Sequence, residues 1–413
     1  MIISHKKFIY NNTIKLIFNK IYKKYPKNIF LSNSKISNNG KIKNYTYEDV
    51  KKEVTRNVAF FKKNNFHIGD RIAIMVGNTP EYFILKLSLN YYGLSCIPIN
   101  KELSINEITY ILDNSDSKYF VISSNGNSII KKILEKFKKK LSVLTLNNSN
   151  RLNFLIKNSF NIVKTSKKLN SKTESSILYT SGTTGKPKGC ILNHEYEINA
   201  GYSYAKKKGL ISFKVGKERL YNCLPVHHVN SGILSFFAMM ITGNCQIQSE
   251  RFSVKNFWKE INITKATVFH YLGVMAPLLL KNKNNKIEKD NCLRIGVGAG
   301  IEPTLHSKFE KRFKIPMIEL WGMTEMVRCI FDHKKDRDIG MRCIGNPQNI
   351  CEIKVVNELG KKVNNKPGEM LIRYSKRYPR QGFFNGYYKD KKATSHAWEG
   401  GWFKTGDLVI RKK

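Results

Sequence analysis

The 413-residue sequence lacks the features that mark a membrane-spanning or zinc-binding chain. No segment reaches the roughly 18 apolar residues of a membrane-spanning helix. The best candidate, ILSFFAMMIT at residues 233–242, is too short and predicts a buried helix or strand. The eight cysteines form no CxxC pair, which excludes a zinc ribbon and a thioredoxin-like centre. Because no export signal is visible, we expect reduced, mostly buried thiols in a cytoplasmic protein.

Acidic residues and arginine are scarce. The 31 Asp and Glu face 72 Lys and Arg, for a net charge of +41, and only 14 of those cations are arginine. Proteins that read nucleic acid rely on arginine for bidentate contacts. The excess of lysine, beside many Asn and Ile, therefore favours charge spread over a solvated surface. A basic patch for an anionic partner is the alternative.

Helical and strand patterns alternate through most of the chain. Residues 1–26 are basic and loosely amphipathic, without the features of a transit peptide, and predict a first helix packed on the domain. Thr46 begins a capped helix, and apolar strands at 71–76, 95–100 and 118–123 alternate with helices at 81–93 and 105–115. This order predicts an α/β fold.

Two segments interrupt that alternation. Residues 126–173 are rich in Lys and Asn, hold a single acid and only weak helical patterns, and predict a variable surface region. From about residue 350, short strands and turns predict a small β-rich subdomain. We therefore expect two packed βαβ-type subdomains plus that β-rich part. Their predicted ranges are 1–170 for a first α/β subdomain, 171–348 for a second α/β subdomain, and 349–413 for the β-rich part.

A loop rich in Gly, Ser and Thr follows an apolar strand at residues 176–180. Its glycines allow tight turns that aim N–H groups at an anion, its hydroxyls donate to phosphate oxygens, and its two lysines add positive charge. It is not the GxxxxGK[ST] nucleotide loop, because its glycines are too closely spaced and a proline follows the first lysine. The loop comprises Thr180, Ser181, Gly182, Thr183, Thr184, Gly185, Lys186, Pro187, Lys188 and Gly189.

The sequence YTSGTTGKPKG around this loop resembles the signature of the adenylate-forming (AMP-binding) superfamily, which includes acyl-CoA synthetases, luciferases and peptide-synthetase adenylation domains. Further segments resemble family motifs in the expected order: LPVHHVN at 224–230, GAG at 298–300, WGMTE at 321–325, IGNP at 344–347, GE at 368–369 and GWFKTGD at 401–407. Their joint occurrence is specific. The stretch at 251–279 is most similar in appearance to carnitine/crotonobetaine-type CoA ligases.

The resemblance implies the large N-terminal domain of an acyl-CoA ligase, which activates a carboxylic acid with ATP and Mg²⁺ and transfers the acyl group to CoA. A carrier-loading adenylation domain and a non-catalytic nucleotide- or nucleic-acid-binding protein are the alternatives. We expect no nucleic-acid partner. The family's small C-terminal domain, with its hinge and catalytic lysine, is not matched within the 413 residues. We therefore expect a truncated form, with a separately encoded C-terminal domain as a candidate partner.

The resemblance also implies residue roles. Glu325 offers the hard oxygen that Mg²⁺ prefers, Asp407 accepts the ribose hydroxyls, and Trp321 stacks on adenine where the family usually has Tyr. The catalytic positions are Thr184, Lys188, His228, Thr324 and Glu325. The nucleotide-binding positions are Thr180, Ser181, Gly182, Thr183, Thr184, Gly185, Lys186, Lys188, Gly298, Ala299, Gly300, Trp321, Gly322, Met323, Thr324 and Asp407. The acyl-pocket positions are His228, Val229, Tyr271, Gly273, Val274 and Met275. No cage for a quaternary ammonium is identifiable, so the acid stays open.

Overall fold

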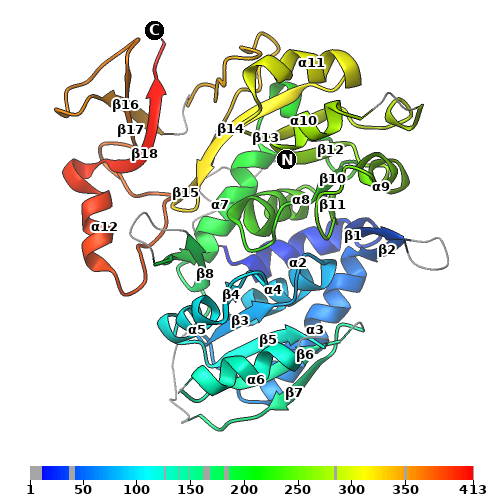
Figure 1. The fold of residues 1–413 in the computed structure, drawn as a ribbon. Coiled ribbons are helices and arrows are strands. Elements are labelled where there is room, and N and C mark those ends of the chain that lie inside the picture. Colours follow the sequence, from blue (N-terminus) through cyan, green and yellow to red (C-terminus); the bar gives the residue numbers. More distant parts are fainter. Residues whose placement is uncertain are drawn as a thin grey trace.

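The computed structural model describes residues 12–36, 42–124, 127–137, 139–147, 149–160, 168–180, 186–282, 286–347 and 351–412. Figure 1 shows two large sheets and a small third sheet at one side. Within these residues, no helix combines the length and apolar character needed to span a bilayer. The predicted α/β class with a β-rich end is confirmed.

The first sheet has seven strands in the order β7-β6-β5-β3-β4-β8-β9. Its inner strands run parallel, and the edge strands β7 and β9 are antiparallel to their neighbours. The strands are β3 (Arg71–Met75), β4 (Ser95–Pro98), β5 (Tyr119–Ser123), β6 (Ser142–Leu146), β7 (Leu152–Ile156), β8 (Glu174–Thr180) and β9 (Lys188–Asn193).

The second sheet has eight strands in the order β15-β14-β13-β12-β10-β11-β1-β2, again parallel inside with antiparallel edges. Its strands are β1 (Ile29–Ile36), β2 (Ile42–Thr46), β10 (Arg219–Asn222), β11 (Cys245–Gln248), β12 (Val268–Leu272), β13 (Ile295–Ala299), β14 (Met317–Met323) and β15 (Met326–Phe331). The small sheet is antiparallel and consists of β16 (Glu352–Val356), β17 (Pro367–Arg373) and β18 (Phe403–Ile410).

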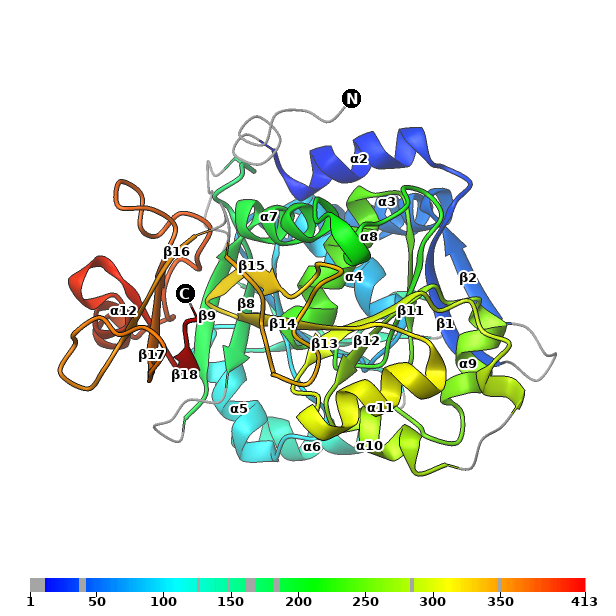
Figure 2. The ribbon, with the colours of Figure 1, turned by 90° about the horizontal axis from the view of Figure 1, so that it is seen from above.

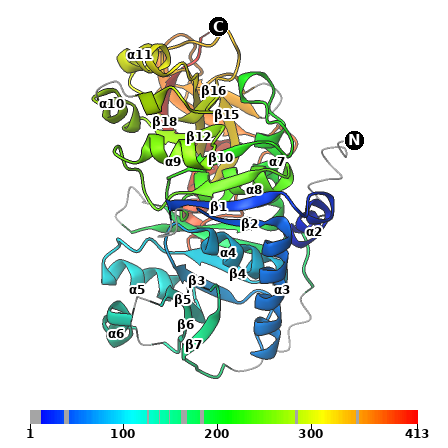
Figure 3. The same cartoon turned by 90° about the vertical axis from the view of Figure 1, so that its right-hand side faces the viewer.

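Helices cover both sides of the large sheets. Figures 2 and 3 show one group on one side: α5 (Ile105–Asn114), α6 (Asn127–Lys136), α9 (Phe257–Thr264), α10 (Met275–Leu280) and α11 (Pro303–Phe313). The other side carries α2 (Ile14–Lys24), α3 (Tyr47–Lys63), α7 (His194–Ala205) and α8 (Phe236–Ile241), the last preceded by a π-helix at Asn230–Ser235. The helix α12 (Lys391–Ala397) lies beside the small sheet. Short 3₁₀ turns occur at Gly209–Ile211, Lys286–Glu288 and Glu399–Gly401.

The helix α4 (Pro80–Tyr92) joins the two large sheets. It contacts β4 of the first sheet and β1 of the second, and nearly all its residues from Pro80 to Asn90 are buried. A helix that is apolar on every side belongs in the interior, which explains its continuous run of large side chains. On it, the ring of Phe83 stacks on Phe236 of α8 with centroids 4.7 Å apart. One hydrophobic core therefore spans both sheets, with smaller clusters under the outer helices.

Local signals placed several elements correctly. The Thr46 side chain accepts from the Asp49 N–H, and the Asp49 carboxylate accepts from the Thr46 N–H at 2.9 Å, so the predicted cap of α3 at Thr46 takes the form of a capping box. Residues 126–173 are more regular than predicted. The parts of this stretch that the structure describes form α6, β6 and β7, and Val143 is fully buried within β6, whose sequence SVLTL includes no lysine.

The sheets exchange strands across residue 170. The early strands β1 and β2 belong to the second sheet, and the later strands β8 and β9 belong to the first. The three predicted ranges therefore stay a prediction about domains rather than a description of the sheets.

Candidate functional site

The predicted phosphate loop joins two paired strands at one edge of the first sheet. Thr180 at the end of β8 pairs with Lys188 at the start of β9. Beside them, the Pro187 carbonyl accepts from the Tyr110 hydroxyl at 3.2 Å, and the Lys186 ammonium lies 5.9 Å from the centroid of the same ring. The loop positions Ser181, Gly182, Thr183, Thr184 and Gly185 lie outside the described residues, so their roles stay predictions.

Lys188 and Glu325 are brought together by a segment that no motif singled out. Residues 383–388 lie along β9: the Tyr388 N–H donates to the Gly189 carbonyl at 2.7 Å, and the Ile191 N–H donates to the Gly386 carbonyl at 3.0 Å. From this segment the Tyr387 hydroxyl donates to Glu325 Oε1 at 2.6 Å. The Lys188 ammonium lies 5.4 Å from the centroid of the Tyr387 ring.

The Glu325 carboxylate is buried, with the residue only 6% exposed. Burial raises the pKa of the Tyr387 hydroxyl, and the Glu325 charge raises it further, so this phenol stays protonated and donates. The Cys190 thiol responds in the same way: its pKa is raised by burial first and by Glu325 second. At neutral pH the Tyr387 hydroxyl and the Cys190 thiol are therefore both protonated and uncharged beside the Glu325 carboxylate.

Trp321 and Asp407 meet although they are 86 positions apart. The Trp321 indole Nε1 donates to Asp407 Oδ2 at 2.8 Å. The Asp407 N–H donates to Thr405 Oγ1 at 3.1 Å, and that hydroxyl donates to the Met370 carbonyl at 2.7 Å. The residue predicted to stack on adenine thus contacts the residue predicted to accept the ribose hydroxyls.

The remaining WGMTE residues form the hairpin between β14 and β15. A Cβ at Gly322 would lie 2.5 Å from Cys329 Sγ, so this position needs glycine. Met323 pairs with Met326 across the hairpin, and the Thr324 carbonyl accepts from the Tyr196 hydroxyl of α7 at 2.6 Å.

The GAG segment ends β13. Gly300 has φ +78°, and its N–H donates to Glu319 Oε2 at 3.0 Å, while the next N–H donates to Oε1 at 3.0 Å. A Cβ at Gly298 would lie 2.1 Å from the Tyr271 carbonyl oxygen of the neighbouring strand. Gly298 is therefore required by strand packing as well as being predicted for adenine. Ala299 between them is half-buried.

The predicted acyl-pocket residues have different surroundings. Tyr271 is fully buried and its hydroxyl donates to Glu319 Oε1 at 2.8 Å. Met275 is also buried, whereas Val274 is exposed. Gly273 packs so tightly on the Gly300 backbone that a Cβ there would lie 1.7 Å from the Gly300 oxygen. The loops after β12 and β13 are thus in contact. Val229 is half-buried at the start of the π-helix.

His228 lies at a cavity of about 500 Å³ between the two large sheets. Asn78 joins its walls, accepting from the Val226 N–H at 3.0 Å and donating to the Glu250 carbonyl at 2.9 Å. The His227 and His228 rings have centroids 4.6 Å apart. Burial lowers the pKa of His228; burial and His228 lower that of His227 to about 4. Both imidazoles are therefore neutral at pH 7. Two cationic side chains, Lys101 and Arg251, and two acidic ones, Glu102 and Glu250, also line this cavity.

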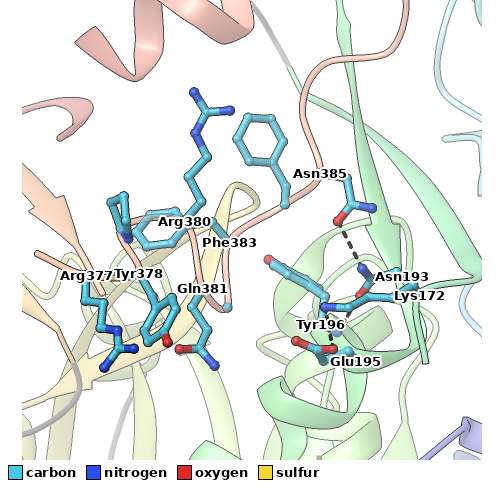
Figure 4. Close-up of a pocket in the computed structure, with 13 residues that line it drawn as sticks. Lys172, Asn193, Glu195, Tyr196, Arg377, Tyr378, Arg380, Gln381, Phe383 and Asn385 are labelled. Atoms are coloured by element: carbon cyan, nitrogen blue, oxygen red, sulfur yellow. Dashed lines mark hydrogen bonds and ion pairs between the residues drawn. The ribbon is translucent and has the colours of Figure 1, made fainter. Parts of the chain in front are cut away.

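A second cavity, of about 670 Å³, lies between residues 377–385 and the N-terminal end of α7 (Figure 4). Asn193 Nδ2 donates to Asn385 Oδ1 at 3.0 Å, and Lys172 pairs with Glu195 at 2.7 Å on its walls. It contains none of the predicted site residues. It adjoins the segment that carries Tyr387.

The side chains present at the site determine whether it suits Mg²⁺. In the parts of the chain that the structure describes, no group of three or more His, Cys, Asp or Glu side chains is arranged to hold a metal ion. Mg²⁺ in nucleotide enzymes is held by one or two carboxylates plus phosphates and water. The single buried carboxylate of Glu325, with Oε1 fixed by a phenol, fits that mode.

The comparisons with known proteins identify the class. The family model described as "AMP-binding enzyme" matches residues 18–388, and the chain belongs to this family. The resemblance to acyl-CoA synthetases is confirmed.

Curated relatives are named crotonobetaine/carnitine–CoA ligases. One from Citrobacter koseri is 25% identical over 386 residues, covering 91% of this chain and 73% of the relative. Another from Proteus mirabilis is 26% identical over 385 residues, covering 89% and 72%. The predicted similarity to this group of ligases is confirmed.

Solved structures show the same fold. A fatty acyl CoA synthetase from Mycobacterium tuberculosis superposes with a TM-score of 0.77 at 18% identity, covering 96% of this chain and 75% of that one. MatB from Rhodopseudomonas palustris superposes with a TM-score of 0.75 at 19% identity, covering 96% and 76%.

Proposed function

We propose that the protein binds ATP with Mg²⁺ and activates a carboxylic acid as an acyl-adenylate for transfer to CoA. The observation that carries this proposal is the convergence of Trp321 with Asp407, joined by a hydrogen bond of 2.8 Å across 86 positions. An adenine-stacking ring and a ribose-accepting carboxylate have to be adjacent to bind one nucleoside. Composition alone gives no reason for these two exposed segments to meet.

The proposed roles follow the chemistry of attack on the α-phosphorus. Trp321 stacks on adenine, Asp407 accepts the ribose hydroxyls, and the loop at 180–189 with Lys188 holds the departing pyrophosphate. Glu325 would hold Mg²⁺, which neutralises phosphate charge when bound. Neutral His228, at the cavity between the sheets, lies near the acid. The buried positions Tyr271 and Met275 support the acyl site from behind.

The cavity at His228 is proposed to receive CoA. Lys101 and Arg251 on its walls are proposed to contact the phosphates of this co-substrate, beside the carboxylates Glu102 and Glu250, which line the same cavity. Its volume of about 500 Å³ is that of a typical small-molecule site. A binding site that carries both this cavity and a nucleotide site favours a CoA ligase over a carrier-loading domain, and the relatives are named as CoA ligases.

The test is the effect of Mg·ATP on thermal unfolding, followed by ATP–pyrophosphate exchange with a panel of carboxylic acids. Wild type is expected to gain stability with Mg·ATP, because a ligand that binds only the folded state raises the free energy of unfolding. Glu325→Gln keeps the size and removes the charge, and should reduce the gain. An acid that forms a tightly held adenylate should raise the midpoint further and so name the substrate.

A nucleic-acid binder would behave differently. It would be retained on DNA or RNA in a steeply salt-dependent way and would be indifferent to Glu325→Gln. Mg·ATP that leaves wild-type unfolding unchanged at millimolar concentration would contradict the proposed function.

A further inference from the structure

We propose that Tyr387 is a positioning residue for nucleotide activation: its hydroxyl orients the Glu325 carboxylate toward Mg²⁺ bound with ATP. This inference rests on the proposed function. Tyr387 lies outside every motif that carries the family resemblance, between the GE segment at 368–369 and the GWFKTGD segment at 401–407.

The hydrogen bond to Glu325 is short, and its carboxylate end is buried. The Tyr387 hydroxyl lies 2.6 Å from Oε1, and Glu325 is only 6% exposed. A carboxylate with one oxygen tied to a fixed donor presents the other oxygen in a defined direction. Partners of this kind, one shell away from a metal, set ligand orientation and strongly affect metal affinity.

Tyr387 is itself held firmly. Its N–H donates to Thr394 Oγ1 at 2.9 Å, and it forms a β-bridge with Cys190 of β9. Three positions earlier on the same segment, the Phe384 N–H donates to the Glu325 carbonyl at 2.9 Å. Three attachments therefore fix the phenol relative to both the hairpin that carries Glu325 and the strand that follows the phosphate loop.

The ring of Tyr387 has a second contact that allows the hydroxyl to be tested alone. The Lys188 ammonium lies 5.4 Å from the ring centroid, within the range of a cation–π interaction. Tyr387→Phe keeps this ring and removes only the hydroxyl. Any change in Mg²⁺ dependence then reports on the bond to Glu325 rather than on Lys188.

The next residue supplies a matched control. Tyr388 lies on the same segment, but its hydroxyl donates to Asp116 at 2.7 Å and its ring lies 4.0 Å from the Arg71 guanidinium carbon. Tyr388→Phe removes the same hydroxyl group from the same segment, but at a side chain that contacts the first sheet. Neither Tyr388 nor Asp116 has been placed in the nucleotide site.

The experiment measures ATP binding by calorimetry in Mg²⁺ and in EDTA, for wild type, Tyr387→Phe and Tyr388→Phe, with thermal unfolding to verify the fold. Tyr387→Phe is expected to weaken binding of Mg·ATP about tenfold and binding of metal-free ATP less than about twofold. Tyr388→Phe is expected to leave both affinities within about twofold of wild type.

Equal loss with and without Mg²⁺, no loss, or tighter binding of Mg·ATP by Tyr387→Phe would overturn the proposal. If Tyr387→Phe does not fold, Tyr387→Met removes the hydroxyl together with the ring contact to Lys188, so for that variant the excess loss of Mg·ATP binding over the loss of metal-free ATP binding tests the bond to Glu325. A wild type that binds Mg·ATP, together with an unaffected Tyr387 variant, refutes this inference alone. A wild type that binds no nucleotide refutes the proposed function itself.

Discussion

Replacing Trp321 with Phe should uncouple Asp407 from the nucleotide site. The substitution keeps an aromatic face for adenine and removes the indole N–H that donates to Asp407 Oδ2 at 2.8 Å. Hydrogen bonds to charged groups contribute about 1.5–3 kcal/mol when shielded. Here Trp321 is half-buried and Asp407 exposed, so water competes for the carboxylate and we expect about 1 kcal/mol. That corresponds to roughly fivefold weaker binding of Mg·ATP.

A double-mutant cycle isolates this coupling. Mg·ATP affinity is measured by calorimetry for wild type, Trp321→Phe, Asp407→Ala and the double variant. In the Asp407→Ala background the hydrogen bond is already absent, so the effect of Trp321→Phe on Mg·ATP affinity comes only from the change of stacking ring. The coupling free energy between the two substitutions should therefore be about 1 kcal/mol. Trp402→Phe is the control, because that indole packs on Arg373, with the guanidinium carbon 4.0 Å from the ring centroid. Strict additivity of the two substitutions would refute the reasoning.

Three further outcomes are expected. The ion pair between Lys86 and Glu197 is almost fully buried at 2.9 Å, so Lys86→Met should lower the free energy of unfolding in urea by about 3–5 kcal/mol, and adding Glu197→Leu should recover most of it. Burial lowers the pKa of His270 to about 3. From pH 6.5 downward the unfolded chain binds a proton that the folded chain does not, so stability falls by about 1.4 kcal/mol per pH unit. His270→Gln removes this proton uptake, so the urea midpoint should fall less between pH 7 and pH 5 in the variant than in wild type. Finally, Arg251→Ala and Lys101→Ala should raise KM for CoA in a thioester assay while leaving ATP–pyrophosphate exchange unchanged.

Local chemistry was the part of the fold that could be predicted. The α3 cap depends on Thr46 and Asp49, three residues apart, and the small β-rich sheet was predicted from short apolar runs separated by turns. Sheet membership was not predictable in this way. Leu31 of β1 pairs with Gln246 of β11, and nothing in either run identifies a partner so distant. The buried strand at Val143 was missed because it is short and directly follows a lysine-rich run, whose composition is typical of an exposed surface.

The residues of the candidate site, like the elements of the fold, were predictable only in part. Motif resemblance singled out Trp321 and Asp407 separately, and the structure adds that they share a hydrogen bond. Tyr387 was missed because neither tyrosine of GFFNGYY carries a sequence signal of its own. Its importance arises from a bond to Glu325 that exists only after residues 383–388 align with β9. The glycines beside these tyrosines, after β17, are the sequence feature that indicates a close approach of two backbone segments.

The exchange of strands between the two sheets has a consequence for biosynthesis. When the ribosome has released the first 170 residues, β1 and β2 still lack β11, and β4 still lacks β8. Neither half can complete its own sheet: the first sheet needs β8 and β9, which end at Asn193, and β1 has no parallel partner until β11 at Cys245–Gln248. Such long-range pairing slows folding and exposes intermediates to aggregation. Expression of either half alone is therefore expected to yield insoluble material, and folding of the whole should depend on chaperones that shield β1 and β2 in the interval.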